Sequence, residues 1–362
     1  IVIFACFIVA LLMLNFACPM NSIASYSSPA SLSNSLSCKD AINKGINWLV
    51  DEQKEDGSWS SDMGITAISI LAFLNAGYDE SNATVSSAIQ YILQYVQPDG
   101  SITSGTNDVY YTSVAVLALL ATNKPNYNVQ ISRGVNFLVS AQATEEDGIE
   151  RDNWWYGGIG YGGDGRPDLS NTQFALMAIY SAKQKLALSI PNELWSKALV
   201  FVYRCQNLPE VNDLPWAHNT SSSSYNDGGF IYDSKPESLA GGLEPLSYGS
   251  MTAAGLWCLR LSGVALENIS VRRALDWLKL RYESTWSENP NFGMKALYYY
   301  YWTVARALTL SHVSRIERDS YMHDWFAELS SRLIGMQKDT GQWVNSKVAF
   351  WESIPELTTA YA

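Results

Sequence analysis

One pattern of apolar residues recurs along most of this chain and constrains its fold more than any other feature. In the copies that begin at Ile42 and Ile131, apolar residues follow at i+4, i+7 and i+8, and a glutamine stands at i+11. These steps return to one side of an α-helix, so each copy predicts an amphipathic helix with a single apolar stripe. Shorter or weaker copies begin at Val85, Leu194, Val271 and Phe326.

A turn follows each stripe. The first copy continues as Gln53-Lys-Glu-Asp-Gly-Ser-Trp59, and related stretches lie in 97–101, 142–148, 206–229 and 337–343. The Asp-Gly pair tolerates a positive φ, so the helix ends there and the chain reverses. After each turn comes a segment that is almost apolar all round and rich in Ala, Ser and Thr, which predicts a helix buried on most faces. These segments are 65–74, 113–121, 172–180, 252–261, 297–310 and 357–362.

The alternation of half-exposed and buried helices predicts two concentric rings. The expected fold class is all-α, an (α/α)6 toroid or barrel of helical hairpin repeats. A linear solenoid is the alternative, but it would not need such uniformly apolar inner helices and would require polar caps. The sequence ends at Ala362, within the sixth buried segment. We therefore expect the last repeat to be truncated and the closure of the ring to be imperfect.

The N-terminal residues and the charge bear on location and partners. Residues 1–18 are an apolar run followed by small residues, which predicts a signal peptide over 1–24. The alternative is an uncleaved anchor that contacts the membrane, and both place the body outside the cytoplasm, as a secreted, periplasmic or extracellular protein. Residues 25–37 predict a disordered Ser-rich linker and 38–362 the toroid domain. A net charge of −11 argues against nucleic acid as a partner.

The stretch Gln53-Lys-Glu-Asp-Gly-Ser-Trp59 and its partial repeats resemble the QW repeats of the squalene cyclase and prenyltransferase superfamily. The resemblance covers about residues 38–362, and stretches 157–176, 227–232, 247–256 and 297–308 resemble a secreted branch of that superfamily. It implies an (α/α)6 barrel in which the Gln and Trp of each repeat tie neighbouring outer helices together. It also implies a cavity that opens where the inner helices begin.

The stretch Gly158-Ile-Gly-Tyr-Gly-Gly163 fits the G-x-G-x-x-G spacing of a nucleotide-binding loop. Such a loop follows a β-strand and opens the helix of a βαβ unit. Residues 135–142 predict a helix instead, and no parallel strands appear. We therefore interpret the glycines as a loop over the mouth of the barrel, and we expect Asp168 or Ser170 to cap the next inner helix.

Triterpene cyclases of the superfamily protonate an alkene with the central Asp of an Asp-x-Asp-Asp-Thr motif. Here Asp168-Leu-Ser-Asn-Thr172 stands in a comparable setting, with Ser170 in place of the protonating Asp and Asn171 beside it. A serine hydroxyl is too weak an acid to protonate an alkene, which argues against cyclase activity of that kind. Asp168 is the one candidate catalytic acid, and the alternative is that it only caps its helix.

Protein prenyltransferases of the superfamily bind zinc through Asp, Cys and His. This chain has no Asp-x-Cys and only 3 His. Outside the leader it has Cys38, Cys205 and Cys258, at spacings that match neither a zinc site nor a disulfide framework. We therefore predict no metal site and no cofactor.

The candidate ligand-binding residues are aromatic and polar side chains that we expect near the mouth. Aromatic rings suit an isoprenoid chain, or a cation stabilised by π-faces, and they suit a stacked sugar equally well. Four consecutive tyrosines in 298–301 point around a whole helix, so at most one or two face the lumen. The candidates are Trp155, Tyr156, Tyr161, Arg166, Asp168, Asn171, Tyr232, Tyr248, Ser250 and Tyr299.

Three functions stay open, and the sequence leaves catalysis undecided. The first is a toroid that binds or acts on an isoprenoid or other small apolar ligand in an aromatic-lined central cavity. The second is a non-catalytic binding or scaffold toroid whose lumen is filled by its own side chains. The third is an extracellular polysaccharide-active (α/α)6 enzyme, which needs two carboxylates across an open groove. Asp62, Asp108 and Asp168 precede inner helices, where N-caps are also expected.

Overall fold

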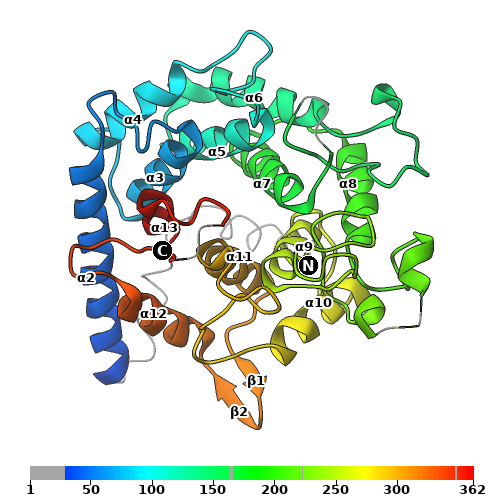
Figure 1. The fold of residues 1–362 in the computed structure, drawn as a ribbon. Coiled ribbons are helices and arrows are strands. Elements are labelled where there is room, and N and C mark those ends of the chain that lie inside the picture. The colour runs from blue at the N-terminus through cyan, green and yellow to red at the C-terminus, as the bar shows by residue number, and fades with distance from the viewer. Residues whose placement is uncertain (1–28, 163–165, 220, 222, 347–348) are drawn as a thin grey trace, which may run out of the picture.

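Twelve α-helices and one β-hairpin make up the computed structural model, which describes residues 29–162, 166–219, 221, 223–346 and 349–362. Six of the helices form an inner ring and six an outer ring (Figure 1). The inner helices are α3 (Met63–Asn75), α5 (Asp108–Ala121), α7 (Leu169–Leu186), α9 (Gly249–Leu261), α11 (Leu297–Leu310) and α13 (Pro355–Tyr361). The outer helices are α2 (Pro29–Glu52), α4 (Ala83–Leu93), α6 (Asn128–Ser140), α8 (Asn192–Arg204), α10 (Ile269–Leu280) and α12 (Trp325–Met336).

Shorter elements lie in the connections. The antiparallel strands β1 (Ile316–Arg318) and β2 (Tyr321–His323) form a hairpin between α11 and α12, which projects from the ring in Figure 1. Single helical turns are η2 (Pro125–Tyr127), η3 (Glu145–Asp147), η4 (Pro215–His218) and η5 (Ser223–Asn226).

The inner ring is closed. Each inner helix packs on the next one in chain order, and α13 packs on both α11 and α3. The predicted toroid is therefore confirmed, and the linear solenoid is wrong, because the first and last repeats of a solenoid do not meet. The expected imperfect closure is also wrong for the inner ring, since the 7 residues of α13 already reach both neighbours.

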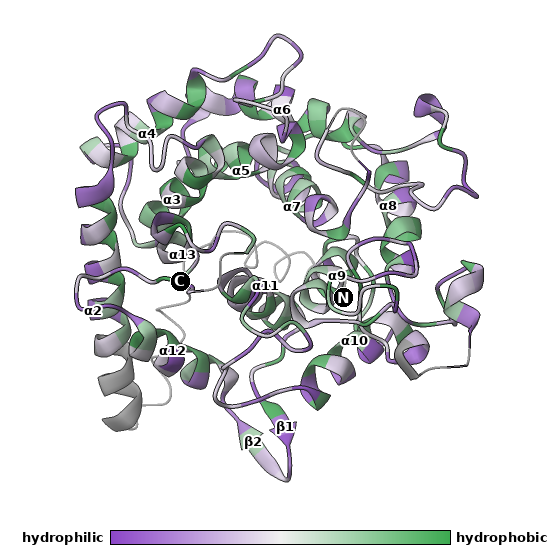
Figure 2. Ribbon diagram, in the orientation of Figure 1, coloured by the Kyte–Doolittle hydropathy of each residue, from purple (hydrophilic) through white to green (hydrophobic). Residues whose placement is uncertain are grey.

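The distribution of apolar residues on each helix explains whether it lies in the inner or the outer ring. In α9 every residue except Arg260 is buried, so this helix has to be surrounded by protein. In α10, by contrast, the buried residues form a stripe that includes Val271, Leu275 and Leu278. Figure 2 shows the same division, with the outer ring mixing apolar and polar residues more than the inner ring. Removing the apolar faces from water is what drives the two rings together.

Glutamines join successive outer helices. The Gln53 side-chain amide donates hydrogen bonds to the carbonyl oxygen of Gly57 in its own turn, at 2.9 Å, and to that of Thr84 in α4, at 2.9 Å. This agrees with the role that the family resemblance implies for the glutamine. The same pair of bonds is made toward α8, α10 and α2 by Gln142, Gln206 and Gln337.

The tryptophans of these repeats act within their own repeat, which differs from the implied role. The Trp59 indole N–H donates to the carbonyl oxygen of Leu49 in α2 at 2.7 Å, and Trp343 makes the same bond to Leu333 in α12. Both rings are buried. Each indole therefore fastens its turn to the last part of the preceding outer helix, while the glutamine reaches the next one.

Gly157 shows why the turns carry glycine. Its φ is +84°, and a Cβ there would lie 1.9 Å from the carbonyl oxygen of Lys197 in α8. Gly57 stands in the same relation to Ser87 in α4. The turn before the G-x-G-x-x-G stretch thus packs closely against an outer helix. In the described residues the only sheet is the antiparallel hairpin, so the stretch does not follow a strand of a βαβ unit there. The last residue of that stretch, Gly163, lies outside the described residues.

Helix α2 begins earlier than expected. It starts at Pro29, so residues 29–37 are helical where we expected a disordered linker over 25–37. Proline is tolerated in the first turn of a helix, and extending a nucleated helix is easier than starting one, so serines do not stop it. The expected signal peptide over 1–24 lies outside the described residues. In the described part of the chain, every helix is too short or too polar to cross a membrane.

Candidate functional site at the head of α7

Asp168 is the N-cap of α7 and is almost completely buried. Its backbone is extended, with φ −142° and ψ 160°, and its Oδ1 accepts a hydrogen bond from the Asn171 backbone N–H at 2.8 Å. The Asn171 side-chain amide donates to the other carboxylate oxygen at 2.7 Å. Only 3% of Asp168 is exposed. The expected cap is therefore present, and the carboxyl group is also withdrawn from water.

Burial raises the pKa of Asp168 to about 7, because a charged carboxylate is disfavoured away from water. Hydrogen bonds from Asn171 and from the Tyr232 hydroxyl favour the charged form and limit the rise. The carboxyl group therefore keeps its proton to a higher pH than an ordinary aspartate does. In its neutral form it can donate a hydrogen bond, which an ionised carboxylate cannot.

The charge of this carboxyl group acts on four of the predicted tyrosines. Burial is the main cause that raises the pKa of each, and the nearby negative charge of Asp168 raises it further. They come from three parts of the chain: the loop before α7, the loop before α9, and α11. The four are Tyr161, Tyr232, Tyr248 and Tyr299.

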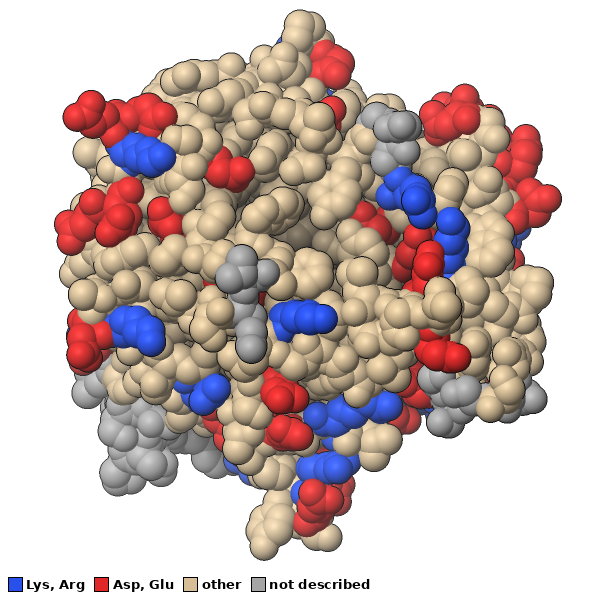
Figure 3. Space-filling view, in the orientation of Figure 1, with Lys and Arg blue, Asp and Glu red and all other residues tan. Residues whose placement is uncertain are grey.

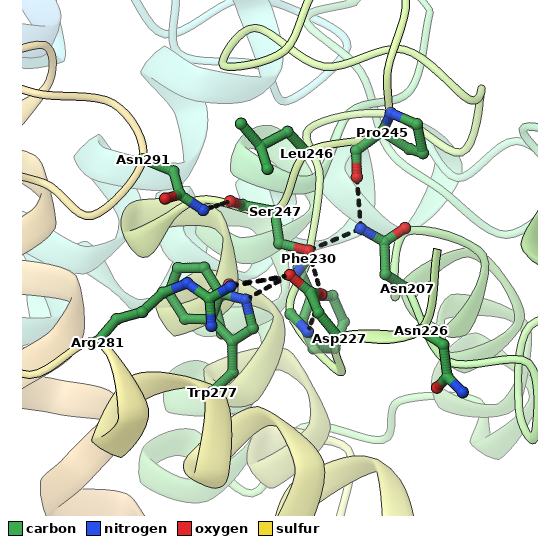
Figure 4. Close-up of polar contacts among 12 residues, drawn as sticks. Asn207, Asn226, Asp227, Phe230, Pro245, Leu246, Ser247, Trp277, Arg281 and Asn291 are labelled. Atoms are coloured by element: carbon green, nitrogen blue, oxygen red, sulfur yellow. Dashed lines mark hydrogen bonds and ion pairs between the residues drawn. The ribbon is translucent and has the colours of Figure 1, made fainter. Parts of the chain in front are cut away.

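A polar network holds the loop that carries Tyr232 and Tyr248 (Figure 4). One oxygen of Asp227 accepts hydrogen bonds from the Gly229 N–H at 2.9 Å and the Ser247 hydroxyl at 2.7 Å. The other oxygen accepts from the indole N–H of Trp277 in α10 at 2.8 Å. Because the network ties both ends of 227–247 to the outer ring, it fixes where the two tyrosines enter the barrel.

The other four predicted residues lie elsewhere or serve the fold. Tyr156 faces the outer wall, where its hydroxyl donates to Glu145 at 2.7 Å. Ser250 is held by the side chain of Asn289, which bonds both its N–H and its hydroxyl. Trp155 is half-buried with Lys235 over its ring, and Arg166 is exposed.

Aromatic rings from different inner helices form a cluster next to Asp168. Tyr299 and Trp302 of α11 pack on Phe174 of α7, with centroids 6.2 and 5.6 Å apart. Both also pack on Tyr361 of α13, at 6.3 and 5.7 Å, and Tyr110 of α5 packs on Phe174 at 5.1 Å. Within 298–301 only Tyr299 is not fully buried, which agrees with the expectation that one or two of these tyrosines face the lumen.

An apolar cavity of about 250 Å³ adjoins this cluster. Trp302 and Tyr361 line it, together with Met177 of α7, Trp257 of α9 and Leu117 of α5. Most of the remaining lining is aliphatic. Figure 3 shows one end of the barrel hollowed near its middle, with mostly uncharged residues around the hollow and most charged residues farther out.

Gln173 belongs to this site and was missed in the sequence. It is fully buried, and its Oε1 accepts a hydrogen bond from the Tyr299 hydroxyl at 2.5 Å. Its Nε2 has no hydrogen-bond partner among the described residues, and neither has Oδ1 of Asn171. Buried polar groups are nearly always paired. The available signal was a glutamine inside an otherwise apolar segment.

The other mouth carboxylates stabilise local structure. Asp62 caps α3 by accepting from the Ile65 N–H, and the Tyr111 hydroxyl donates to its second oxygen, both at 2.8 Å. Asp108 accepts from the Thr103 hydroxyl at 2.8 Å. The causes that act on the pKa of Asp168 are burial, which raises it, and hydrogen bonds from Asn171, Ser170 and Tyr232, which lower it.

The described residues contain no group of three or more His, Cys, Asp or Glu that could hold a metal ion. Cys205 and Cys258 are buried free thiols, and Cys38 is half-buried and also free.

Comparison with known proteins shows what the chain is similar to. Residues 60–194 match the family model of the squalene-hopene cyclase C-terminal domain. The type II terpene cyclase MstE from Scytonema, in a variant bound to its product merosterolic acid A, has the same fold with a TM-score of 0.56. Residues 60–194 are therefore similar to that family, and the chain has the fold of a type II terpene cyclase. That structure is 14% identical and covers 91% of this chain and 96% of its own.

Two further comparisons show how distant the similarity is. Another MstE variant, bound to the substrate geranylgeranyl dihydroxybenzoate, has a TM-score of 0.53 and 14% identity, covering 86% of this chain and 82% of its own. The squalene–hopene cyclase of Alicyclobacillus acidocaldarius is 28% identical over 23% of this chain. The match spans 17% of that relative's length.

Proposed function

We propose that this protein binds an isoprenoid or other apolar ligand in the lumen of its toroid, with the polar end of the ligand toward Asp168. The observation that carries the proposal is a buried carboxyl group beside an aromatic cluster that lines an apolar cavity of about 250 Å³. The superfamily fold supports it, because a protein of the same fold binds geranylgeranyl dihydroxybenzoate. The apolar run at 1–18 supports a location outside the cytoplasm.

The size and lining of the cavity favour a single hydrocarbon chain. Pockets for small molecules commonly measure roughly 300–1,000 Å³, so this cavity is at the small end. Its lining of Trp, Leu, Ile and Met side chains gains from removing a hydrocarbon from water. A short isoprenoid chain therefore fits better than a triterpene.

Proton donation to a ligand is a second candidate, favoured by the pKa of Asp168. An acid with a pKa of about 7 is matched to general acid catalysis near neutral pH. It is too weak to protonate an unactivated alkene. In the motif of the triterpene cyclases an Asp does so, and Ser170 stands at its position in this chain. The reactions within its reach are the opening of an epoxide or the ionisation of an allylic alcohol.

Ligand binding by the purified chain tests the proposal. Lipids that co-purify are extracted and identified by mass spectrometry, and the delipidated protein is titrated with farnesol and geranylgeraniol while tryptophan fluorescence is recorded. We expect the fluorescence to change and to reach a plateau as the alcohol saturates the site. The signal arises because Trp257 and Trp302 line the cavity. A panel of soluble oligosaccharides is the control and should leave the fluorescence unchanged.

The outcomes separate the candidate functions. Product analysis after incubation with epoxidised farnesol should show a ring-opened product that is lost in Asp168→Asn if the group donates a proton. Binding without turnover would support the binding function and exclude proton donation to this substrate. No co-purified lipid and no saturable binding of either alcohol would overturn the proposal in favour of a scaffold toroid.

A further inference from the structure

We infer that the side-chain amide of Gln173 donates a hydrogen bond to an oxygen atom of the ligand, so that the natural ligand is an oxygenated isoprenoid and not a plain hydrocarbon. The inference rests on the proposed function and names its ligand class more narrowly. An alcohol, a ketone, an ether or an epoxide would each supply the oxygen.

Gln173 lies on α7 between Asp168 and Met177, which lines the cavity. Residues four apart on a helix lie on the same face, so Gln173 stands one turn above Met177, which lines the cavity. Its hydrogen-bond partner Tyr299 packs on Trp302, which also lines the cavity. Asp168, the N-cap, lies beyond Gln173 at the head of the helix.

The amide has one satisfied end and one unsatisfied end. Oε1 accepts a hydrogen bond from the Tyr299 hydroxyl at 2.5 Å. This bond fixes the Gln173 side chain and turns its Nε2 away from that hydroxyl. Gln173 is 0% exposed, and Nε2 finds no acceptor in the described part of the chain. An unpaired buried donor is costly, so a ligand that brings an acceptor removes that cost on binding.

This arrangement accounts for the whole length of a ligand. The hydrocarbon tail lies in the cavity among Met177, Trp257 and Trp302. An oxygen accepts from Gln173, and a polar end lies toward Asp168. A hydrocarbon would leave the amide unpaired, and sites built to bind a polar group discriminate strongly against analogues that lack it.

Three probes of matched size test the inference: farnesol, its methyl ether and farnesene. Both oxygenated probes offer an acceptor, and farnesene offers none. We expect the native protein to bind farnesol and the ether about tenfold or more tightly than farnesene. In Gln173→Met the preference should disappear, while the affinity for farnesene stays the same or rises.

Matched variants separate binding from folding. Gln173→Met leaves the Tyr299 hydroxyl without its acceptor, so the double variant Gln173→Met/Tyr299→Phe removes both polar groups together and keeps the packing. Tyr299→Phe alone keeps the Nε2 donor and should keep the preference for oxygenated probes. Thermal unfolding of each variant identifies the ones that are folded, and the binding ratios are read from those.

The possible results distinguish this inference from the function on which it rests. If the native protein binds none of the probes, the proposed function fails and the inference with it. If the native protein binds all three equally, or if the folded double variant keeps the preference, the role of Gln173 is wrong and the proposed function stands.

Discussion

The side-chain amide of Gln337 donates a hydrogen bond to the carbonyl oxygen of Ala41 at 2.8 Å, although the two residues are 296 positions apart in the chain. The same amide bonds the carbonyl oxygen of Gly341 at 2.7 Å. This contact joins α12 to α2 and so links the last outer helix to the first.

Removing that link should destabilise the whole ring. Gln337→Ala leaves the carbonyl oxygens of Ala41 and Gly341 without this donor, and we expect it to lower the free energy of unfolding by about 1–3 kcal/mol. Urea denaturation followed by circular dichroism measures the change. Lys338→Ala, at the exposed neighbouring position, is the control and should stay within about 0.5 kcal/mol of the native protein. An equal effect of the two substitutions would show that the contact does not help to close the ring.

A pair of glycines separates backbone strain from steric contact. Gly157→Ala brings a Cβ 1.9 Å from the Lys197 carbonyl oxygen at a φ of +84°, whereas Gly148→Ala meets nothing within 4 Å at a φ of +74°. We expect Gly148→Ala to cost about 1 kcal/mol of stability from the positive φ alone. Gly157→Ala should cost several times as much, because α8 would have to move. Similar losses in the two variants, measured by thermal unfolding, would argue that the close approach to α8 is not needed.

Asp168 should make stability depend on pH. Burial raises its pKa in the folded state to about 7, above about 3.9 in an unfolded chain. Between these values the folded state binds the extra proton, so the stabilisation is complete below about pH 4 and is lost as the pH rises to about 7. Through this group alone the free energy of unfolding should fall by up to about 4 kcal/mol.

Asp168→Asn isolates that contribution, because asparagine caps helices as well as aspartate and does not titrate. Urea denaturation at intervals from pH 4 to pH 8 should show the variant gaining stability relative to the native protein as the pH rises, with the gain levelling off above pH 7. The exposed substitution Asp339→Asn is the control. Parallel pH profiles for the native protein and Asp168→Asn would contradict the raised pKa.

Asp227 should position Tyr232 and Tyr248 through its links to the outer ring. Asp227→Asn replaces one acceptor oxygen with an N–H₂ group, which cannot accept from the Trp277 indole. We expect a loss of about 1–3 kcal/mol in the free energy of unfolding. The matched control is Asp276→Asn on the exposed side of α10, which should have little effect. Retained stability in Asp227→Asn would mean that the indole bond is not needed to hold this loop.

Much of the fold could be predicted because it depends on the spacing of apolar residues within short stretches of the chain. The apolar stripe from Ile42 recurs along the chain, and a helix follows wherever that spacing occurs. The Asp-Gly turns predict where each helix ends, because glycine tolerates a positive φ. Local patterns misjudged residues 29–37, where a serine-rich stretch continues α2.

The site was harder to predict because proximity across a barrel is not a local property. Tyr156 and Tyr161 stand five positions apart in one loop, yet the first meets Glu145 at the outer wall and the second lies beside Asp168. Ser250 carries the polar group expected of a ligand contact, but Asn289 of the next repeat already engages it.

The sequence by itself determined that twelve helices alternate between half-exposed and buried, that glutamine turns connect them, and that Asp168 heads an inner helix without the acid motif of the triterpene cyclases. These features depend on helical periodicity, capping and turn chemistry, which act over a few residues. The tertiary structure alone decided that α13 meets α3, that the charge of Asp168 acts on four tyrosines from three parts of the chain, and that Gln173 is buried with an unpaired amide N–H₂ group. Those outcomes depend on which faces the closed ring turns inward, and that is set by packing among helices far apart in the chain.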